Sequence, residues 1–269
     1  MPTRVRALVL LVLIGLGGSF GLHLLERAMI FPAPEVPTEW LQQRAQTAGA
    51  TELKLTAEDG TTLYGWHVPA RGEGVVLWFD GNGATVGQRS EQFRALVAEG
   101  WDVVHVNYRG YPGSEGRPSE AGLRQDARAA WAYAEKVAPR RVIYGKSLGG
   151  GVAVGLAAER PAHALVLEST FTRISDVARS MFAGAPVDLL MRSPFDSLAL
   201  APKITCPTLI LHGQDDTLIP ASQARNLAAA LGGPHTVEIL PGLGHNASLL
   251  MTPVGWELAM LTLGSPAQR

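Results

Sequence analysis

The sequence predicts an α/β fold whose sheet is twisted, mostly parallel and covered by helices on both faces. Short runs rich in valine, isoleucine and leucine recur along the chain, and near-continuous runs of this kind are typical of strands buried on both faces. Segments with apolar residues at helical spacing separate them. The 269 residues are 46% hydrophobic, which is enough for one sizeable core.

The expected elements follow one another along residues 51–262. Asp59-Gly60 is a turn signal between two β-prone runs and predicts a hairpin. Ser119 is a candidate N-cap for a long helix. The expected strands cover residues 51–56, 61–68, 74–80, 101–107, 140–145, 163–169, 207–213 and 235–240. The expected helices cover residues 85–99, 119–137, the segment after Ser147, 221–231 and 247–262.

Composition excludes several classes of protein. The net charge is −1, so no basic surface for nucleic acid is indicated and no such partner is expected. The single cysteine, Cys206, rules out an intramolecular disulfide. No zinc-ligand spacing or calcium-loop pattern occurs. Neither a metal nor a cofactor is therefore expected.

The N-terminal segment differs in composition from the rest of the chain. Residues 7–22 carry no charge, and with the next three residues they approach the length of a spanning helix. We expect residues 1–27 to form a transmembrane signal anchor. A cleaved signal peptide and a buried helix are the alternatives, although the flank Gly-Ser-Phe-Gly-Leu-His is a poor cleavage site. Arg4 and Arg6 favour a cytoplasmic N-terminus, which predicts a single-pass protein with the remainder of the chain on the periplasmic or extracellular side.

Three prolines in "FPAPEVPTEW" predict an extended linker over residues 28–50. Residues 51–269 form the expected catalytic domain.

Ser147 lies in Gly145-Lys146-Ser147-Leu148-Gly149, between an expected strand and a helix of small residues. This G-x-S-x-G pattern is that of a nucleophile elbow, a sharp turn that exposes the serine hydroxyl and needs small neighbours. The alternative is an ordinary helix N-cap. A Walker A loop would need glycine at position 140, where arginine stands, and a dinucleotide loop would need glycine at position 86, where valine stands.

A nucleophilic serine needs a base, and the base needs an orienting acid, in the chain order serine, acid, histidine. His245 lies in a glycine-rich turn between the last strand and the last helix and is the candidate base; the alternative is a solvated loop histidine. Asp215 and Asp216 follow the strand 207–213, and only one of them can reach the base. Glu168, at the end of the preceding strand, is a further candidate, or else pairs with a nearby cation.

The chain resembles α/β-hydrolases of the membrane-anchored, hydrolase-domain-containing subgroup, which has peptidase-like and protein depalmitoylase relatives. The resemblance implies the α/β-hydrolase fold with a short cap insertion at about residues 170–203. It assigns the acid to Asp216 and the oxyanion-hole amides to Leu148 and Asn82. One departure is Asp80, which stands at the usual histidine position, where a carboxylate would favour the charged form of the base. The stretches that carry the resemblance are "FDGNG", "NYRGYPGSEGRPSEAGLRQDA", "YGKSLGG", "FDSL", "PTLILHGQDDTLIP" and "PGLGHN".

These features predict a serine hydrolase that cleaves an acyl bond through Ser147, His245 and Asp216 and an acyl-enzyme. The cap sequence is rich in apolar residues, which favours a small-molecule or lipid-derived substrate with an apolar acyl group in carboxylic ester or thioester linkage. A lipid-linked protein thioesterase is one alternative. A catalytically silent, membrane-tethered binding protein is the other.

Overall fold

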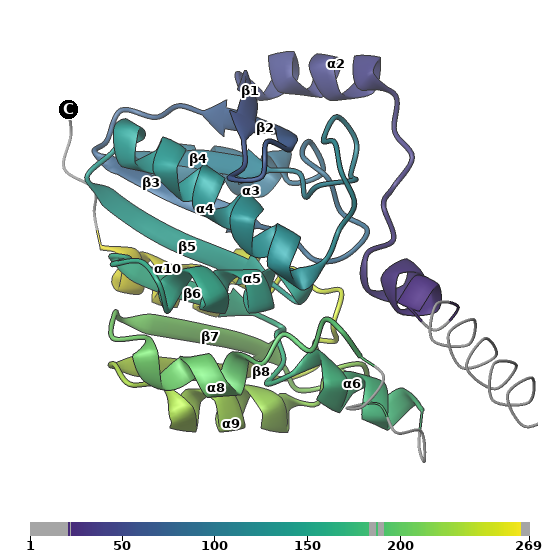
Figure 1. Ribbon diagram of the computed structural model, residues 1–269. Coiled ribbons are helices and arrows are strands. Elements are labelled where there is room, and N and C mark those ends of the chain that lie inside the picture. The colour runs from purple at the N-terminus through teal and green to yellow at the C-terminus, as the bar shows by residue number, and fades with distance from the viewer. Residues whose placement is uncertain (1–20, 22, 183–186, 188–190, 265–269) are drawn as a thin grey trace, which may run out of the picture.

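One twisted sheet organises the protein in the computed structural model, which describes residues 21, 23–182, 187 and 191–264 (Figure 1). Eight strands of this described part pair in the order β1-β2-β4-β3-β5-β6-β7-β8. The hairpin strands β1 and β2 are antiparallel to their neighbours, and the pairs from β4 to β8 are parallel. The strands are β1 (Thr51–Thr56), β2 (Thr62–Val68), β3 (Gly74–Phe79), β4 (Trp101–Val106), β5 (Arg140–Lys146), β6 (Ala164–Glu168), β7 (Thr208–Gly213) and β8 (His235–Leu240). The predicted fold class is confirmed.

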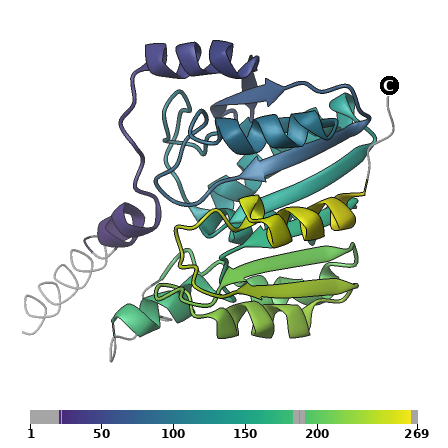
Figure 2. The ribbon, with the colours of Figure 1, turned by 180° about the vertical axis from the view of Figure 1, so that it is seen from behind.

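Helices cover both faces of the sheet. Figure 1 shows α4, α5, α8 and α9 on the near face, and the reverse view in Figure 2 brings α3 and α10 to the front. Each face has its own cluster of buried apolar side chains, so the strands are buried on both sides as their uninterrupted apolar runs predict. These helices are α3 (Ser90–Ala98), α4 (Glu120–Val137), α5 (Leu148–Ala157), α8 (Ser197–Leu200), α9 (Ala221–Ala230) and α10 (Pro253–Leu263).

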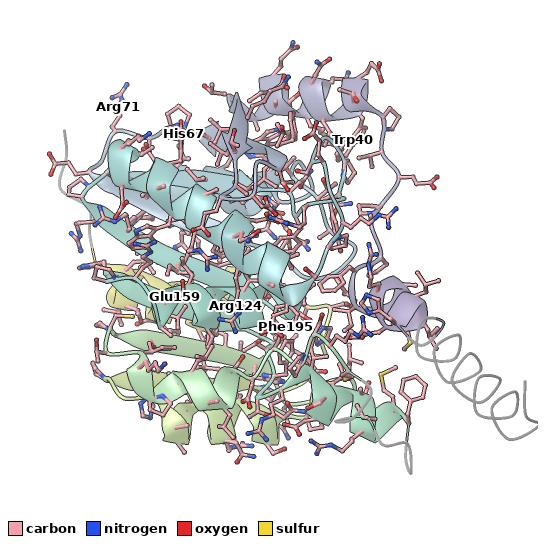
Figure 3. The ribbon with its side chains drawn as sticks, viewed as in Figure 1. Trp40, His67, Arg71, Arg124, Glu159 and Phe195 are labelled. Atoms are coloured by element: carbon pink, nitrogen blue, oxygen red, sulfur yellow. The ribbon has the colours of Figure 1, made fainter. Side chains whose placement is uncertain are left out.

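Two helices of the near face are also joined at the surface. Arg124 of α4 lies 3.9 Å from the Glu159 carboxylate, which follows α5, and 2.9 Å from the Glu120 carboxylate one turn earlier. Figure 3 shows Arg124 and Glu159 on this outer side and Phe195, from the segment between β6 and β7, toward the end of the sheet. Ion pairs at the protein surface add little stability, so the helices are held mainly by the core beneath them.

The last helix begins later than expected. α10 starts at Pro253, whereas the sequence pattern predicts a start near residue 247. Thr252 caps the helix by accepting a hydrogen bond from the Gly255 amide at 3.0 Å, and proline is well suited to the first helical position. A short 3-10 turn, η2 (Leu249–Met251), occupies the residues before it.

The linker predicted over residues 28–50 is wrong in part. Only residues 31–37, which hold the three prolines, are extended; α2 (Thr38–Ala48) follows them. Leu41 and Ala45 lie one turn apart on α2 and are buried against Trp66 of β2. Two apolar residues at this spacing suffice to dock a short helix because the sheet supplies the opposite surface.

Most of the predicted membrane anchor lies outside the described residues, which begin at residue 21 and continue from 23. Residues 23–30 form a helix, here called the N-terminal helix, and Phe31 after it is buried. No helix within the described part of the chain is long and apolar enough to cross a membrane.

The insertion between β6 and β7 contains α6 (Ile174–Met181), α8 and a 3-10 turn, η1 (Ala201–Lys203). α6 lies beside the N-terminal helix at one end of the sheet (Figures 1 and 2). This is the end at which the parallel strands finish, where α/β proteins carry their sites.

Candidate active site

Ser147 stands at a strained corner between β5 and α5. Its φ is +50° and its ψ is −115°, a conformation that a non-glycine residue adopts only when its surroundings impose it. A side chain at Gly145 would overlap the Gly149 carbonyl, and one at Gly149 would overlap the Phe79 carbonyl. The two glycines of the motif are therefore required by the close approach of β3, β5 and α5 at this turn.

His245 connects Ser147 to Asp216. Its Nε2 lies 3.1 Å from Ser147 Oγ, and its Nδ1 lies 2.8 Å from Asp216 Oδ2. The three side chains come from the end of β5, the turn after β7 and the turn after β8. The structure thus brings together all three residues that the sequence selects, whereas Asp215 is exposed.

Asp216 is held as a carboxylate. It accepts hydrogen bonds from the Leu218 and Ile219 amides at 3.0 and 2.8 Å, and its Oδ2 lies 3.4 Å from His212 Nε2. Burial alone would raise the pKa of Asp216, but the hydrogen bonds from His212, His245 and Ile219 outweigh it and hold the pKa well below its usual range. An ionised carboxylate can accept a hydrogen bond from His245 Nδ1–H and so orient the ring.

His212 shapes the turn that presents Asp216. The buried ring lies with Nε2 2.7 Å from the Ile219 carbonyl. Nε2 therefore carries the proton and donates it across the turn. His212 supports the site from behind and does not reach Ser147.

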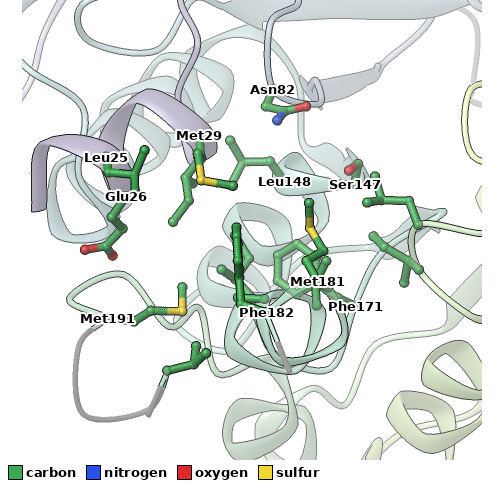
Figure 4. A pocket seen from close by; sticks show the side chains of 17 residues that line it. Leu25, Glu26, Met29, Asn82, Ser147, Leu148, Phe171, Met181, Phe182 and Met191 are labelled. Carbon is green, nitrogen blue, oxygen red and sulfur yellow. The ribbon is translucent and has the colours of Figure 1, made fainter. Parts of the chain in front are cut away.

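The two residues predicted to supply oxyanion-hole amides line the pocket together with Ser147. Leu148 is the first residue of α5, so its N–H has no partner within the helix. Asn82 lies in the turn after β3 and lines the same pocket as Ser147 and Leu148 (Figure 4). Leu148 and Asn82 are therefore both in the wall of the pocket that holds Ser147, and their role as oxyanion-hole donors stays a prediction.

Asp80 does not act on the site as an unpaired charge. Its buried carboxylate pairs with Arg89 at 2.8 and 3.0 Å and accepts from the Gly81 amide at 3.0 Å. Burial would lower the pKa of Arg89, but Asp80 more than offsets this and raises it. Tyr108 Oη donates to the Asp80 carbonyl at 2.7 Å. These contacts fix the turn that carries Asn82.

The loop after β4 is stabilised by its own hydrogen bonds and ion pairs. Arg109 lies between two carboxylates, with Nε 2.9 Å from Asp126 and Nη1 2.7 Å from Asp59. Ser114 Oγ donates to the Asn107 carbonyl at 2.9 Å. Arg109 and Ser114 thus stabilise the turn beside the site.

The sequence patterns miss one functional contact, made by the second residue of the serine motif. Lys146 Nζ lies 2.6 Å from the buried Glu168 and donates to the Ala247 carbonyl at 2.7 Å. Glu168 also accepts from the amides of Leu249 and Leu250. Glu168 is thus the carboxylate that pairs with a cation, the alternative to an acid of the site. The signal available in the sequence was a lysine and a glutamate at the ends of adjacent strands.

An apolar pocket of about 370 Å³ opens at Ser147. Its walls come from the N-terminal helix, α6 and the residues after α6 (Figure 4). Ile219, whose amide donates to Asp216, also lines it. Among the described residues of its lining, Glu26 alone is charged, and its Oε1 accepts two backbone hydrogen bonds. Among the described residues, no cluster of three His, Cys, Asp or Glu side chains could hold a metal ion.

The chain is similar to several known hydrolases. The family model for serine aminopeptidase, S33, matches residues 70–193. The α/β hydrolase domain-containing protein WAV2 of Arabidopsis thaliana is 30% identical over 248 residues, covering 81% of this chain and 80% of that protein. The chain belongs to the α/β-hydrolase superfamily.

Two further matches come from esterases and lipases of the superfamily. Lysophosphatidylserine lipase ABHD12 of Danio rerio is 33% identical to this hydrolase over 195 residues, which are 62% of this chain and 51% of that protein. The solved structure of the Pyrococcus furiosus esterase Pf2001 superposes with a TM-score of 0.70 at 18% identity, covering 86% of this chain and 96% of the esterase. At that identity the likeness shows the fold.

Proposed function

We propose that this α/β-hydrolase is a serine hydrolase that cleaves a carboxylic ester or thioester of an apolar acyl group. The observation that carries the proposal is the chain of hydrogen bonds from Asp216 through His245 to Ser147, which ends at the apolar pocket. A serine, a base within hydrogen-bond reach and an ionised acid behind the base are the parts that acyl transfer needs.

In the proposed reaction, His245 Nε2 takes the Ser147 proton as Oγ attacks the substrate carbonyl carbon. The positive charge that develops on the ring is stabilised by Asp216. The tetrahedral intermediate collapses with expulsion of the alcohol or thiol, which receives the proton from His245 Nε2–H. Water then attacks the acyl-enzyme with His245 as the base, and the acid is released while the proton returns to Ser147.

The oxyanion formed in both steps is assigned to the amides of Leu148 and Asn82. The Leu148 amide stands at a helix N-terminus, where the helix dipole favours negative charge. A single donor of this kind contributes on the order of 3 kcal/mol to the lowering of the barrier. The Asp80–Arg89 pair supports this role because it holds the turn that presents Asn82.

The apolar pocket favours an acyl chain over a peptide. Its lining includes Met29, Phe171, Val177 and Met181, and each methylene buried there contributes about 0.8 kcal/mol to binding. A lipase of lysophosphatidylserine is among the relatives, which agrees with a lipid-derived substrate. Thioester hydrolysis, including deacylation of a lipidated protein, needs the same groups.

A fluorophosphonate probe tests the proposal because it forms a covalent bond only with an activated serine. We expect labelling of the full chain and its loss in Ser147→Ala. Ser222→Ala, which removes an exposed serine on α9, is the matched control and keeps full labelling. A wild-type protein that is not labelled, and does not hydrolyse p-nitrophenyl esters of any chain length, would instead be a silent binding protein.

We further propose that residues 7–25 anchor the protein in a membrane with the hydrolase domain on the non-cytoplasmic side. The support is the uncharged run and the position of Arg4 and Arg6 before it. Alkaline carbonate extraction tests anchoring, and a reporter fused after Arg269 tests orientation. A protein that washes off the membrane and starts near residue 22 would identify a cleaved signal peptide.

A further inference from the structure

Exposed apolar side chains gather around the mouth of the pocket. Eight large hydrophobic side chains of the described residues are exposed, and five of these belong to the pocket lining. Soluble surfaces rarely collect such residues at one place unless something covers them. These five, here called the apolar rim, are Leu25 (55% exposed), Met29 (39%), Met181 (53%), Phe182 (44%) and Leu218 (40%).

The rim comes from three segments that are far apart in the sequence. Leu25 and Met29 belong to the N-terminal helix, Met181 and Phe182 to the end of α6, and Leu218 to the turn after β7. Figure 4 shows the first four around one opening, with Ser147 on the inner side. An apolar surface that is assembled from separate segments is a feature of the folded protein and not of a single hydrophobic segment.

The N-terminal helix is fastened to the cap. Glu26 Oε1 accepts hydrogen bonds from the Arg192 and Ser193 amides at 3.0 and 2.8 Å. Phe31 is buried, with its ring 6.3 Å from that of Phe195. The helix therefore holds a fixed position relative to α6, and the rim residues of both face the same opening.

The chain that precedes the rim indicates what covers it. In the sequence, the uncharged run of residues 7–22 directly precedes residues 23–30 of the N-terminal helix. With the next three residues this run approaches the length of a membrane-spanning helix, and it leads directly to Leu25 and Met29. Because this apolar segment directly precedes the rim, a lipid surface is the partner that the order of the chain favours.

We propose that the apolar rim is a membrane-contacting surface, with Met181 and Phe182 of α6 reaching the acyl region beside the N-terminal helix. The acyl chain of a membrane-borne substrate then passes into the pocket without entering water, a transfer that is disfavoured about fourfold per methylene at equilibrium. The route of the substrate rests on the proposed function; the contact between rim and lipid does not.

Lipid quenching tests the contact on the full chain. With Cys206→Ser as the background, Phe182→Cys is labelled with an environment-sensitive fluorophore and the protein is incorporated into phosphatidylcholine vesicles that contain doxyl-labelled lipid. Met181→Cys is a second rim position. Leu261→Cys is the matched control because Leu261 is 72% exposed on α10, outside the pocket lining. All three positions are exposed, so labelling requires no unfolding.

We expect blue-shifted emission and strong quenching at positions 182 and 181 and little of either at 261. Equal quenching at all three positions, or none at 181 and 182, would overturn the proposal. A blue shift at 182 without lipid, growing with protein concentration, would also overturn it, because a second copy would then cover the rim.

A kinetic comparison tests the route. Phe182→Ser should lower kcat/KM for a vesicle-borne long-chain ester about tenfold, and more than for a water-soluble short-chain ester, whereas Leu261→Ser changes neither. An equal loss on both esters would overturn the lateral route. Fluorophosphonate labelling of the same samples reports on Ser147 independently. Lipid quenching without fluorophosphonate labelling would support the membrane contact of the rim and contradict the proposed hydrolase activity.

Discussion

Lys146 Nζ lies 2.6 Å from Glu168 Oε1, and this buried pair fastens the loop of His245 to the strand of Ser147. Lys146 reaches the Ala247 carbonyl, two residues after His245, at 2.7 Å. Glu168 accepts from the Leu249 and Leu250 amides at 3.2 and 3.1 Å. The distance between base and nucleophile is therefore set by a second connection beneath the site.

Lys146→Met should impair both folding and turnover. Removing one partner of a buried pair leaves the other charge uncompensated, and we expect the free energy of unfolding to fall by about 3 kcal/mol. A shift of His245 by about 1 Å would lower kcat about 10²-fold. Urea denaturation and ester hydrolysis measure the two effects.

Lys54→Met is the matched control, because Lys54 is exposed on β1, a strand at the edge of the sheet. It should leave stability and kcat near wild type. Lys146→Arg, which keeps the charge, should recover part of the activity. A Lys146→Met protein with normal kcat would show that the His245 loop positions itself without this contact.

Asp216→Asn should reduce kcat far more than Asp215→Asn. Asp216 contacts His245 Nδ1 and is ionised, whereas Asp215 is exposed. An amide cannot stabilise the charged ring, and the analogous change in another triad lowers kcat about 10⁴-fold. Steady-state hydrolysis of a p-nitrophenyl ester compares the two variants, and similar losses would show that the acid is misassigned.

Asp80 and Arg89 should behave as a coupled pair. Arg89→Met leaves the Asp80 carboxylate, 2% exposed, without its cation, and we expect a loss of about 3 kcal/mol in stability. Asp80→Asn in the same chain removes the uncompensated charge. The double variant should therefore lose less free energy of unfolding than the two single variants lose together. A double-mutant cycle by urea denaturation measures this coupling; strict additivity would argue against it.

Local patterns were sufficient to predict the sheet and the serine corner. Uninterrupted apolar runs marked the parallel strands, and Gly145 and Gly149 marked the place where backbones meet. The partly wrong linker at residues 28–50 shows the limit of local patterns. The prolines predict the extended residues 31–37, whereas the docking of α2 depends on Trp66, far along the chain.

The candidate site was predictable where a motif fixes one residue at one turn, as at Ser147, Asp216 and His245. The contacts that support it were not. Glu168 stood as a possible acid because its position at a strand end was visible, but its partner Lys146 became evident only when β5 and β6 were placed side by side. The position of the N-terminal helix in the wall of the pocket could not be predicted for the same reason.

His105 should make the stability depend on pH. The ring is buried on β4, and burial is the main cause that lowers its pKa to about 4 from 6.5, with Arg89 adding to the shift and Asp80 opposing it. Between these two values the unfolded chain binds a proton that the folded protein does not. The free energy of unfolding therefore falls as the pH falls from about 6.5 to about 4, by about 3 kcal/mol.

His105→Leu should flatten this dependence, because leucine fills the site between Phe93 and the sheet without a titrating group. Asp216 does not confuse the measurement: its pKa is lowered, so its contribution is lost only below about pH 4. His235→Leu, at an exposed position on β8, is the control and should keep the wild-type slope. Urea denaturation midpoints are measured between about pH 4.5 and about pH 7.5, a range that spans the titration of the unfolded histidine. If the midpoint of His105→Leu changed with pH as steeply as that of the wild type, the assignment to His105 would be contradicted.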